Sequence, residues 1–170
     1  MGDTRVTTVL QMMKHLNAEP RLASVDGVAV RAFRHDDVDA WLSLRDRAFA
    51  RERVGVRAWS ETDFRREFLG RWWWRPEWMW LAEHDSGDDG TELVGSVSLA
   101  MRGESDRAKP VVHWLMVAPR WRRRGVGRLL LSQSEQAAWA AGYREIWLET
   151  HARWEAAVKF YEALGYRAAR

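Results

Sequence analysis

The sequence predicts an α/β domain over residues 27–170, in which helices and strands are mixed around one central sheet. The chain has 170 residues, a length that suits one domain with one sizeable core. Its composition, 46% hydrophobic and 30% charged, is typical of a globular protein and not of a disordered one. Strand, helix, helix, three strands, helix, strand and helix follow one another without internal repeats, an order that indicates a mixed α/β fold.

The first 26 residues are predicted as an N-terminal extension ahead of that domain. Val6, Leu10 and Met13 recur there at helical spacing, which favours a short amphipathic helix. Residues 28–33 then alternate in the manner of a strand, and this strand opens the domain.

Two helices are predicted between this strand and residue 70. Asp36 and Asp37 are candidate N-caps for the first helix, which carries apolar residues from Val38 to Phe49. Ser60 with Asp63 forms the pattern of a capping box, which opens the second helix.

The middle of the chain predicts three strands. Residues 78–82 and 93–100 flank a polar turn at residues 85–90, so we expect them to form an antiparallel hairpin. Residues 111–117 are an apolar run followed by Pro119, which favours a strand over a helix.

The last third of the chain predicts a helix, a strand and a second helix. Val126 begins an apolar stripe at helical spacing, and Gly142 ends that helix. Residues 145–149 form a strand pattern. The final helix runs from about Trp154 to Leu164.

Composition excludes several classes of protein. The chain has no cysteine, which rules out disulfides, thiolate metal sites and a cysteine nucleophile, and we predict no metal site. No apolar run approaches the roughly 20 residues of a membrane span. A secretory signal is not visible either, so a cytoplasmic location without membrane partners is expected. The net charge of +3 is modest, although 24 of the 27 basic residues are arginines.

The segment from Val117 to Arg128 carries the sharpest chemical pattern. A buried strand ends, a short basic turn follows, and Gly125 and Gly127 open a helix. Glycines allow a ligand close to the backbone, and free N–H groups at a helix N-terminus bind anions. A diphosphate is the expected guest. A Walker loop requires a lysine after its final glycine, where Arg128 stands. A dinucleotide-binding fingerprint requires a third glycine, where Leu130 stands.

This segment resembles motif A of the GNAT N-acetyltransferase superfamily, with Arg122, Gly125 and Gly127 at the matching positions. The stretch that contains Tyr161 and Gly165 is similar to motif B of that family. The resemblance extends from about residue 28 to residue 166. It implies a GNAT-like acyl-CoA N-acyltransferase fold, with a central, mostly antiparallel sheet flanked by helices.

The resemblance also implies an activity, the transfer of an acetyl group from acetyl-CoA to a primary amine of a small molecule or protein. Tyr161 matches the tyrosine that protonates the departing CoA thiolate. A backbone N–H near residues 115–117 would polarise the thioester carbonyl. The residues implied at the cofactor are Leu115, Met116, Val117, Arg122, Arg123, Arg124, Gly125, Val126, Gly127, Arg128 and Trp154.

Two residues are candidates for the general base, and the family has no single fixed one. Histidine changes charge near neutral pH, so His113 could accept the proton of the amine directly or through water. Glu149 stands at the C-terminal end of a strand, where α/β sites often lie. The structural alternative for His113 is a partly buried strand residue without a catalytic role. The structural alternative for Glu149 is a salt bridge at the rim of the sheet.

Two departures from the family pattern concern its last third. Trp154 stands where members often have asparagine, and an indole cannot make both hydrogen bonds of an amide. Only four residues follow Tyr166, so the C-terminal hairpin looks truncated, unless another segment or subunit fills that edge.

Other interpretations stay open at this point. The chain could be an acyl-CoA sensor without turnover, or an arginine-rich nucleic-acid-binding domain, which the modest charge and the glycine spacing disfavour. We therefore expect a small-molecule or peptide amine as partner and no nucleic acid, with a homodimer left open. Tryptophans crowd residues 72–80, either as structural packing or as an aromatic wall beside the acceptor.

Overall fold

The computed structural model describes residues 9–51, 57–87 and 90–169. The strands are β1 (Val9–His15), β2 (Val28–Ala32), β3 (Met79–Asp85), β4 (Thr91–Arg102), β5 (Lys109–Val117), β6 (Glu145–His151) and β7 (Arg167–Ala168). The helices are α1 (Val38–Phe49), α2 (Glu61–Phe64), α3 (Val126–Ala140) and α4 (Glu155–Ala163). Short 3₁₀ turns are η1 (His35–Asp37), η3 (Pro76–Trp78) and η5 (Pro119–Trp121), and η2 (Arg65–Leu69) is a π-helical turn.

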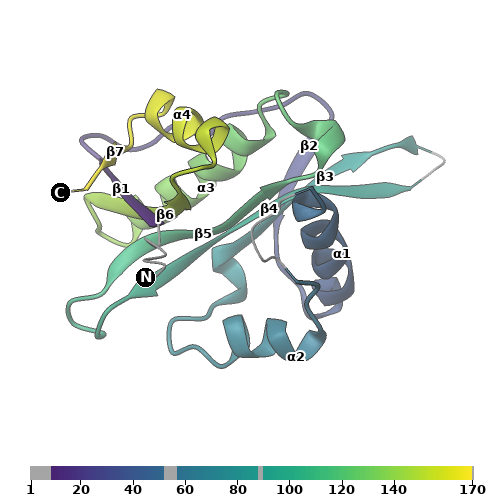
Figure 1. Ribbon diagram of the computed structural model, residues 1–170, viewed down its shortest axis with the longest axis horizontal. Helices are drawn as coiled ribbons and strands as arrows, with labels where there is room; N and C mark the ends of the chain where they lie inside the picture. The colour runs from purple at the N-terminus through teal and green to yellow at the C-terminus, as the bar shows by residue number, and fades with distance from the viewer. Residues whose placement is uncertain (1–8, 52–56, 88–89, 170) are drawn as a thin grey trace, which may run out of the picture.

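All seven strands form one sheet in the order β2-β3-β4-β5-β6-β1-β7. Every neighbouring pair is antiparallel except β5 and β6. Figure 1 shows α3 and α4 on one face of this sheet and α1 and α2 on the other. We call these the α3/α4 face and the α1/α2 face. The predicted class, a mostly antiparallel sheet flanked by helices, is confirmed.

The helix predicted within the first 26 residues is wrong, because residues 9–15 form the strand β1. This strand pairs with β6 along its whole length, and Met12 and Leu16 are buried in the core. The apolar residues of this segment fit the period of a helix and also that of a strand. The segment forms a strand because the edge of β6 offers it backbone hydrogen-bond partners. Val6 lies outside the described residues.

The edge beside β6, where a C-terminal hairpin looks truncated in the sequence, is filled by a segment from the opposite end of the chain. β1 lies between β6 and the short β7, and β7 pairs with it at Met12 and Met13. The edge of β6 that faces β1 is thereby paired along its whole length. The edge is therefore filled by another segment of the chain, which is one of the two alternatives that the sequence left open.

The predicted central elements are confirmed with small shifts of their ends. β3 and β4 pair as the expected antiparallel hairpin. The capping box of α2 is present, with the Ser60 hydroxyl accepting from the Asp63 N–H and the Asp63 carboxylate accepting from the Ser60 N–H. α1 begins after Asp37 as expected, but the Asp37 carboxylate binds Arg31 and the Arg34 N–H and does not cap the helix.

One hydrophobic core lies on each face of the sheet. On the α3/α4 face, α3 packs very close to β4 because Gly95 has no side chain. A Cβ at Gly95 would lie 2.7 Å from the Leu130 Cδ1 atom and 3.1 Å from the Met116 carbonyl oxygen. On the α1/α2 face, Trp41 is fully buried and donates to the Ser96 hydroxyl at 3.1 Å, which ties α1 to β4.

The tryptophans of residues 72–80 are mostly structural. Trp73 is buried, and Trp74 packs against Phe33 and Phe68 with ring centroids 5.7 and 5.4 Å away. Trp72 differs, since 60% of its surface is exposed. The packing interpretation therefore describes Trp73 and Trp74.

Candidate functional site

The strands β5 and β6 are paired only where they begin. Val111 pairs with Trp147 and Val112 with Leu148, and no later pair joins the two strands among the described residues. His113 follows the last paired residue of β5. A gap between two parallel strands leaves backbone groups free for a ligand that enters edge-on.

Trp114 forms a β-bulge at the point where the strands separate. β4 and β5 pair through Ser98 with His113 and through Ser96 with Met116, so β5 has one extra residue between these pairs. Trp114 has a φ of 49°, the left-handed region that bulky residues rarely adopt. The bulge turns the backbone of β5 out of the ladder beside the predicted cofactor residues 115–117.

The N-terminus of α3 has the features of an anion site. Gly125 caps the helix with a φ of 87°, a conformation that favours glycine. Within the described parts of the chain, the N–H groups of residues 123–128 have no hydrogen-bond partner. A Cβ at Gly127 would lie 3.2 Å from the Phe160 Cζ atom, so α4 packs closely over this turn. Free N–H groups and the helix dipole together attract a phosphate.

The arginines of this turn have different surroundings. Arg122 Nη2 donates to the Ala48 carbonyl oxygen at 2.5 Å, so this side chain ties the turn to the C-terminal end of α1. Arg124 lies over the Trp121 ring, 5.1 Å from its centroid. Arg123 and Arg128 are exposed. The side chain of Arg122 is thus occupied by the protein itself, whereas the other three reach solvent.

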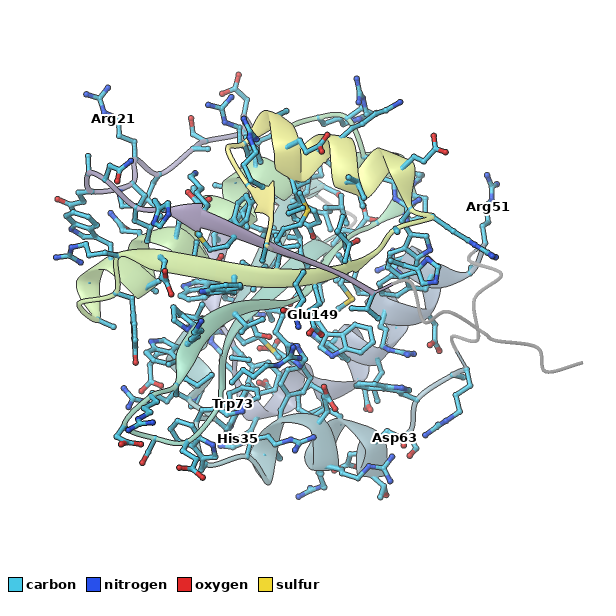
Figure 2. The ribbon with its side chains drawn as sticks, turned by 60° about the vertical axis from the view of Figure 1, so that its left-hand side comes forward. Arg21, His35, Arg51, Asp63, Trp73 and Glu149 are labelled. Atoms are coloured by element: carbon cyan, nitrogen blue, oxygen red, sulfur yellow. The ribbon has the colours of Figure 1, made fainter. Side chains whose placement is uncertain are left out.

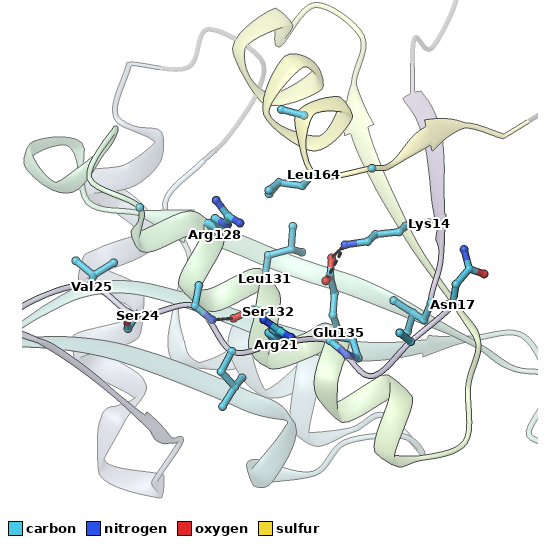
Figure 3. Close-up of a pocket in the computed structure, with 18 of the residues that line it drawn as sticks. Lys14, Asn17, Arg21, Ser24, Val25, Arg128, Leu131, Ser132, Glu135 and Leu164 are labelled. Atoms are coloured by element: carbon cyan, nitrogen blue, oxygen red, sulfur yellow. Dashed lines mark hydrogen bonds and ion pairs between the residues drawn. The ribbon is translucent and has the colours of Figure 1, made fainter.

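A cavity of about 1160 Å³ opens beside this turn. Figure 3 shows it between the segment of residues 17–26, α3 and the end of α4, with Arg128 near one end and Lys14 near the other. Arg124 and Gly125 also line it. At the far end Lys14 Nζ lies 2.9 Å from both oxygens of Glu135, so that end carries an ion pair, whereas Arg124 and Arg128 add positive charge at the start of α3.

Tyr161 lies on α4 and is buried in the core of the α3/α4 face. Burial raises the pKa of its phenol to about 12. Its ring packs against Phe160 and Tyr166, with centroids 5.3 and 5.8 Å away. The hydroxyl therefore stays protonated at neutral pH and can act as a proton donor.

Trp154 precedes α4 and is partly buried against α1. Its ring stacks on Phe49 at 6.1 Å with an interplanar angle of 27°. The indole Nε1 is buried and has no hydrogen-bond partner in the described part of the chain. A buried unpaired donor is costly, and a ligand carbonyl would satisfy it.

Glu149 lies on β6, one residue after the last pair with β5. Figure 2 shows it on the side of β6 that faces α1 and α2. Arg102 forms a bidentate ion pair with its carboxylate, with Nη2 2.9 Å from Oε2, and Gln11 Nε2 donates to Oε1 at 3.1 Å. These contacts match the alternative of a salt bridge at the rim, and they leave the carboxylate less available to a substrate.

His113 contacts a carboxylate that the sequence patterns do not single out. Its Nε2 atom lies 2.8 Å from Glu67 Oε1, and Glu67 belongs to the π-helical turn η2. The hydrogen bond with His113 holds the pKa of the Glu67 carboxyl below its usual range. The two residues are 46 positions apart, and no local motif connects them.

A family model described as the acetyltransferase (GNAT) family matches residues 38–166. A mycothiol acetyltransferase of Acidothermus cellulolyticus is 31% identical over 176 residues, which cover 98% of this chain and 53% of that relative. The chain spans about half the length of the curated relatives that it matches.

Two solved structures are similar in fold. A GCN5-related N-acetyltransferase from Sphaerobacter thermophilus has a TM-score of 0.67 and 23% identity, over 95% of this chain and 48% of that chain. An aminoglycoside N-acetyltransferase in complex with CoA has a TM-score of 0.64 and 19% identity, over 84% of this chain and 90% of that chain. At these identities the likeness concerns the fold.

Proposed function

The chain belongs to the acetyltransferase (GNAT) family, and on that premise we propose that it transfers an acetyl group from acetyl-CoA to a primary amine of a small molecule or peptide. The observation that carries this proposal is the gap between β5 and β6 next to the free N–H groups at the start of α3. The gap between the strands suits the pantetheine arm and the acyl group of acetyl-CoA, and the free N–H groups suit its pyrophosphate.

The residues around the gap fit CoA. N–H groups of residues 123–128 would hold the pyrophosphate, with Arg123, Arg124 and Arg128 as electrostatic support. The cavity beside Arg124 would take the nucleotide end. The unpaired indole N–H of Trp154 would donate a hydrogen bond to a carbonyl of the pantetheine arm. Trp154 would thereby replace the donor, but not the acceptor, of the asparagine that family members often have here.

The proposed proton transfers use groups of β5 and α4. His113 would accept the proton of the amine at the point where β5 and β6 separate. A backbone N–H of residues 115–117 would polarise the thioester carbonyl. Tyr161, whose pKa is about 12, would give its proton to the departing thiolate. Glu149 stays a second prediction for the base, although Arg102 occupies it.

The acceptor and the setting of the reaction stay predictions. The relatives named above are mycothiol and aminoglycoside acetyltransferases, which supports an amine on a polar small molecule as the first class to screen. No helix among the described residues is long and apolar enough to cross a membrane. A cytoplasmic location and the exclusion of nucleic-acid and membrane partners are proposed on sequence grounds alone.

Calorimetry with acetyl-CoA and a thiol-release assay over a panel of amines test this function. We expect micromolar or tighter binding and release of CoA with at least one amine. Tyr161→Phe should keep acetyl-CoA affinity and lose about 100-fold in turnover, because a positioned acid contributes about that factor. Binding without turnover in the unmutated protein would favour the acyl-CoA sensor. Absence of binding would contradict both readings.

A further inference from the structure

Glu67 is a charged side chain at the candidate site that the reaction described above does not use. We infer that Glu67 is a positioning residue for His113, and that the two side chains form a dyad that removes the proton from the acceptor amine. The inference rests on the proposed function and assigns a role to a residue on the α1/α2 face.

The geometry of the pair determines which nitrogen of His113 is basic. Nε2 lies 2.8 Å from Glu67 Oε1, within ordinary hydrogen-bond range. A carboxylate only accepts hydrogen bonds, so Nε2 carries the proton and Nδ1 keeps its lone pair. Among the described residues, Nδ1 has no hydrogen-bond partner. The free lone pair is therefore the one that an incoming amine can meet.

Neighbouring groups hold the carboxylate in place. Trp114 Nε1 lies 3.4 Å from the same Oε1 atom, and Arg71 Nη2 lies 3.7 Å from Oε2. Arg45 of α1 also faces this region, with its guanidinium 5.0 Å from the Trp114 ring centroid and its charge attracted by Glu67. Three positive or donating groups thus favour the ionised form of Glu67, and the pair is a carboxylate and an imidazole.

Aromatic neighbours hold the imidazole ring of His113 in place. Edge contacts to Phe68, Trp73 and Trp114 place the ring centroids 5.7, 5.9 and 6.0 Å from His113. Glu67 and Phe68 both belong to η2, whose π-helical geometry changes the direction of their side chains relative to an α-helix. Insertions of this kind are frequent at functional sites.

The chemical step balances with these groups. As the amine nitrogen forms its bond to the acyl carbon, its proton moves to His113 Nδ1. The imidazolium that results is stabilised by the Glu67 carboxylate. The bond between carbon and sulfur then breaks, and the thiolate takes a proton from Tyr161. His113 then releases its proton to water, and the Tyr161 phenolate takes one back from water.

A double-mutant cycle tests the dyad. His113→Gln should lower kcat by about 100-fold and Glu67→Gln by about 10-fold, with an unchanged KM for acetyl-CoA. The double variant should lose no more than His113→Gln, because Glu67 acts through His113. Glu61→Gln, on the preceding helix α2 and paired with exposed Arg65, is the matched control and should keep full activity. Losses that multiply in the double variant would overturn the inference.

An NMR measurement of the His113 tautomer separates this inference from the proposed function. The ring nitrogen signals of His113, identified by their absence in His113→Gln, should show the Nε2–H tautomer in the unmutated protein, because the carboxylate 2.8 Å away accepts from Nε2. Glu67→Ala removes this acceptor and should remove the preference for that tautomer. An inactive unmutated protein would contradict the proposed function, whereas the same tautomer in Glu67→Ala would overturn the dyad whether or not the protein is active.

Discussion

The two faces of the sheet assemble their functional groups in different ways. On the α3/α4 face, the proposed anion site comes from a single short segment, in which η5 ends and Gly125 caps α3. On the α1/α2 face, His113 of β5 meets Glu67 of η2 across 46 positions of sequence. One site is built from consecutive backbone groups and the other from side chains brought together by the fold.

This difference teaches where substitutions should act. Backbone N–H groups depend on chain conformation, so substitutions of glycine should act on the proposed cofactor side. The pair of His113 and Glu67 depends on the packing of η2 against β5, so changes of charge and hydrogen bonding should act on the proposed acceptor side. The three predictions below test this contrast, beginning with the largest expected effect.

Gly125→Val should weaken acetyl-CoA binding by about 100-fold, or about 2.7 kcal/mol. Valine strains the backbone at a φ of 87°, and its Cβ would lie 3.3 Å from the Val25 Cγ2 atom, which moves the N–H groups away from the pyrophosphate. Arg124→Ala should cost only about 3-fold, because an exposed charge contributes little. Calorimetry measures both.

Gly125→Ala and thermal unfolding are the controls for this pair. Alanine should give an intermediate loss of affinity, and a cooperative unfolding transition would show that the variants fold. Equal or reversed losses for Gly125→Val and Arg124→Ala would mean that the segment is a simple basic patch.

Stability should decline at alkaline pH because of the buried phenol on the α3/α4 face. Burial raises the pKa of Tyr161 to about 12, above the value of about 10 in an unfolded chain. A raised pKa stabilises the fold fully below pH 10, and this contribution of about 2 kcal/mol disappears as the pH rises toward 12. Urea unfolding at several pH values between 7 and 12 follows this loss.

Tyr161→Phe should show a smaller decline over the same pH range, since it has no phenol to ionise there. Burial also raises the pKa of Tyr166, beside Glu135, so part of the decline should remain in this variant. An identical alkaline decline in the two proteins would show that Tyr161 is not shielded from water.

Glu149→Gln should have the smallest effect. Its exposed ion pair with Arg102 contributes less than about 1 kcal/mol to the free energy of unfolding, as is usual for pairs at the surface. Turnover should change by no more than about 3-fold, because the base is placed on His113. Arg102→Gln is the matched variant in the unfolding and thiol-release assays. A tenfold loss of turnover in Glu149→Gln alone would make Glu149 the base.

Most of the elements could be predicted from local patterns, and one could not. The capping box at Ser60 and the hairpin of β3 and β4 depend on neighbouring residues, so their sequence signals suffice. β1 was expected as a helix, because apolar spacing alone does not tell which edge a segment will pair with. Only the open side of β6 decides that residues 9–15 form a strand.

The sequence by itself determined the family, the segment proposed to bind an anion at the start of α3, and the place of Tyr161 on α4, since the motifs for each lie in short segments. Tertiary structure alone decided the partners of the candidate bases. It placed Glu149 against Arg102 and His113 against Glu67, and it filled the edge of β6 with β1. Contacts between distant residues follow from packing of whole elements, and a π-helical turn or a bulge redirects side chains in ways that spacing does not reveal.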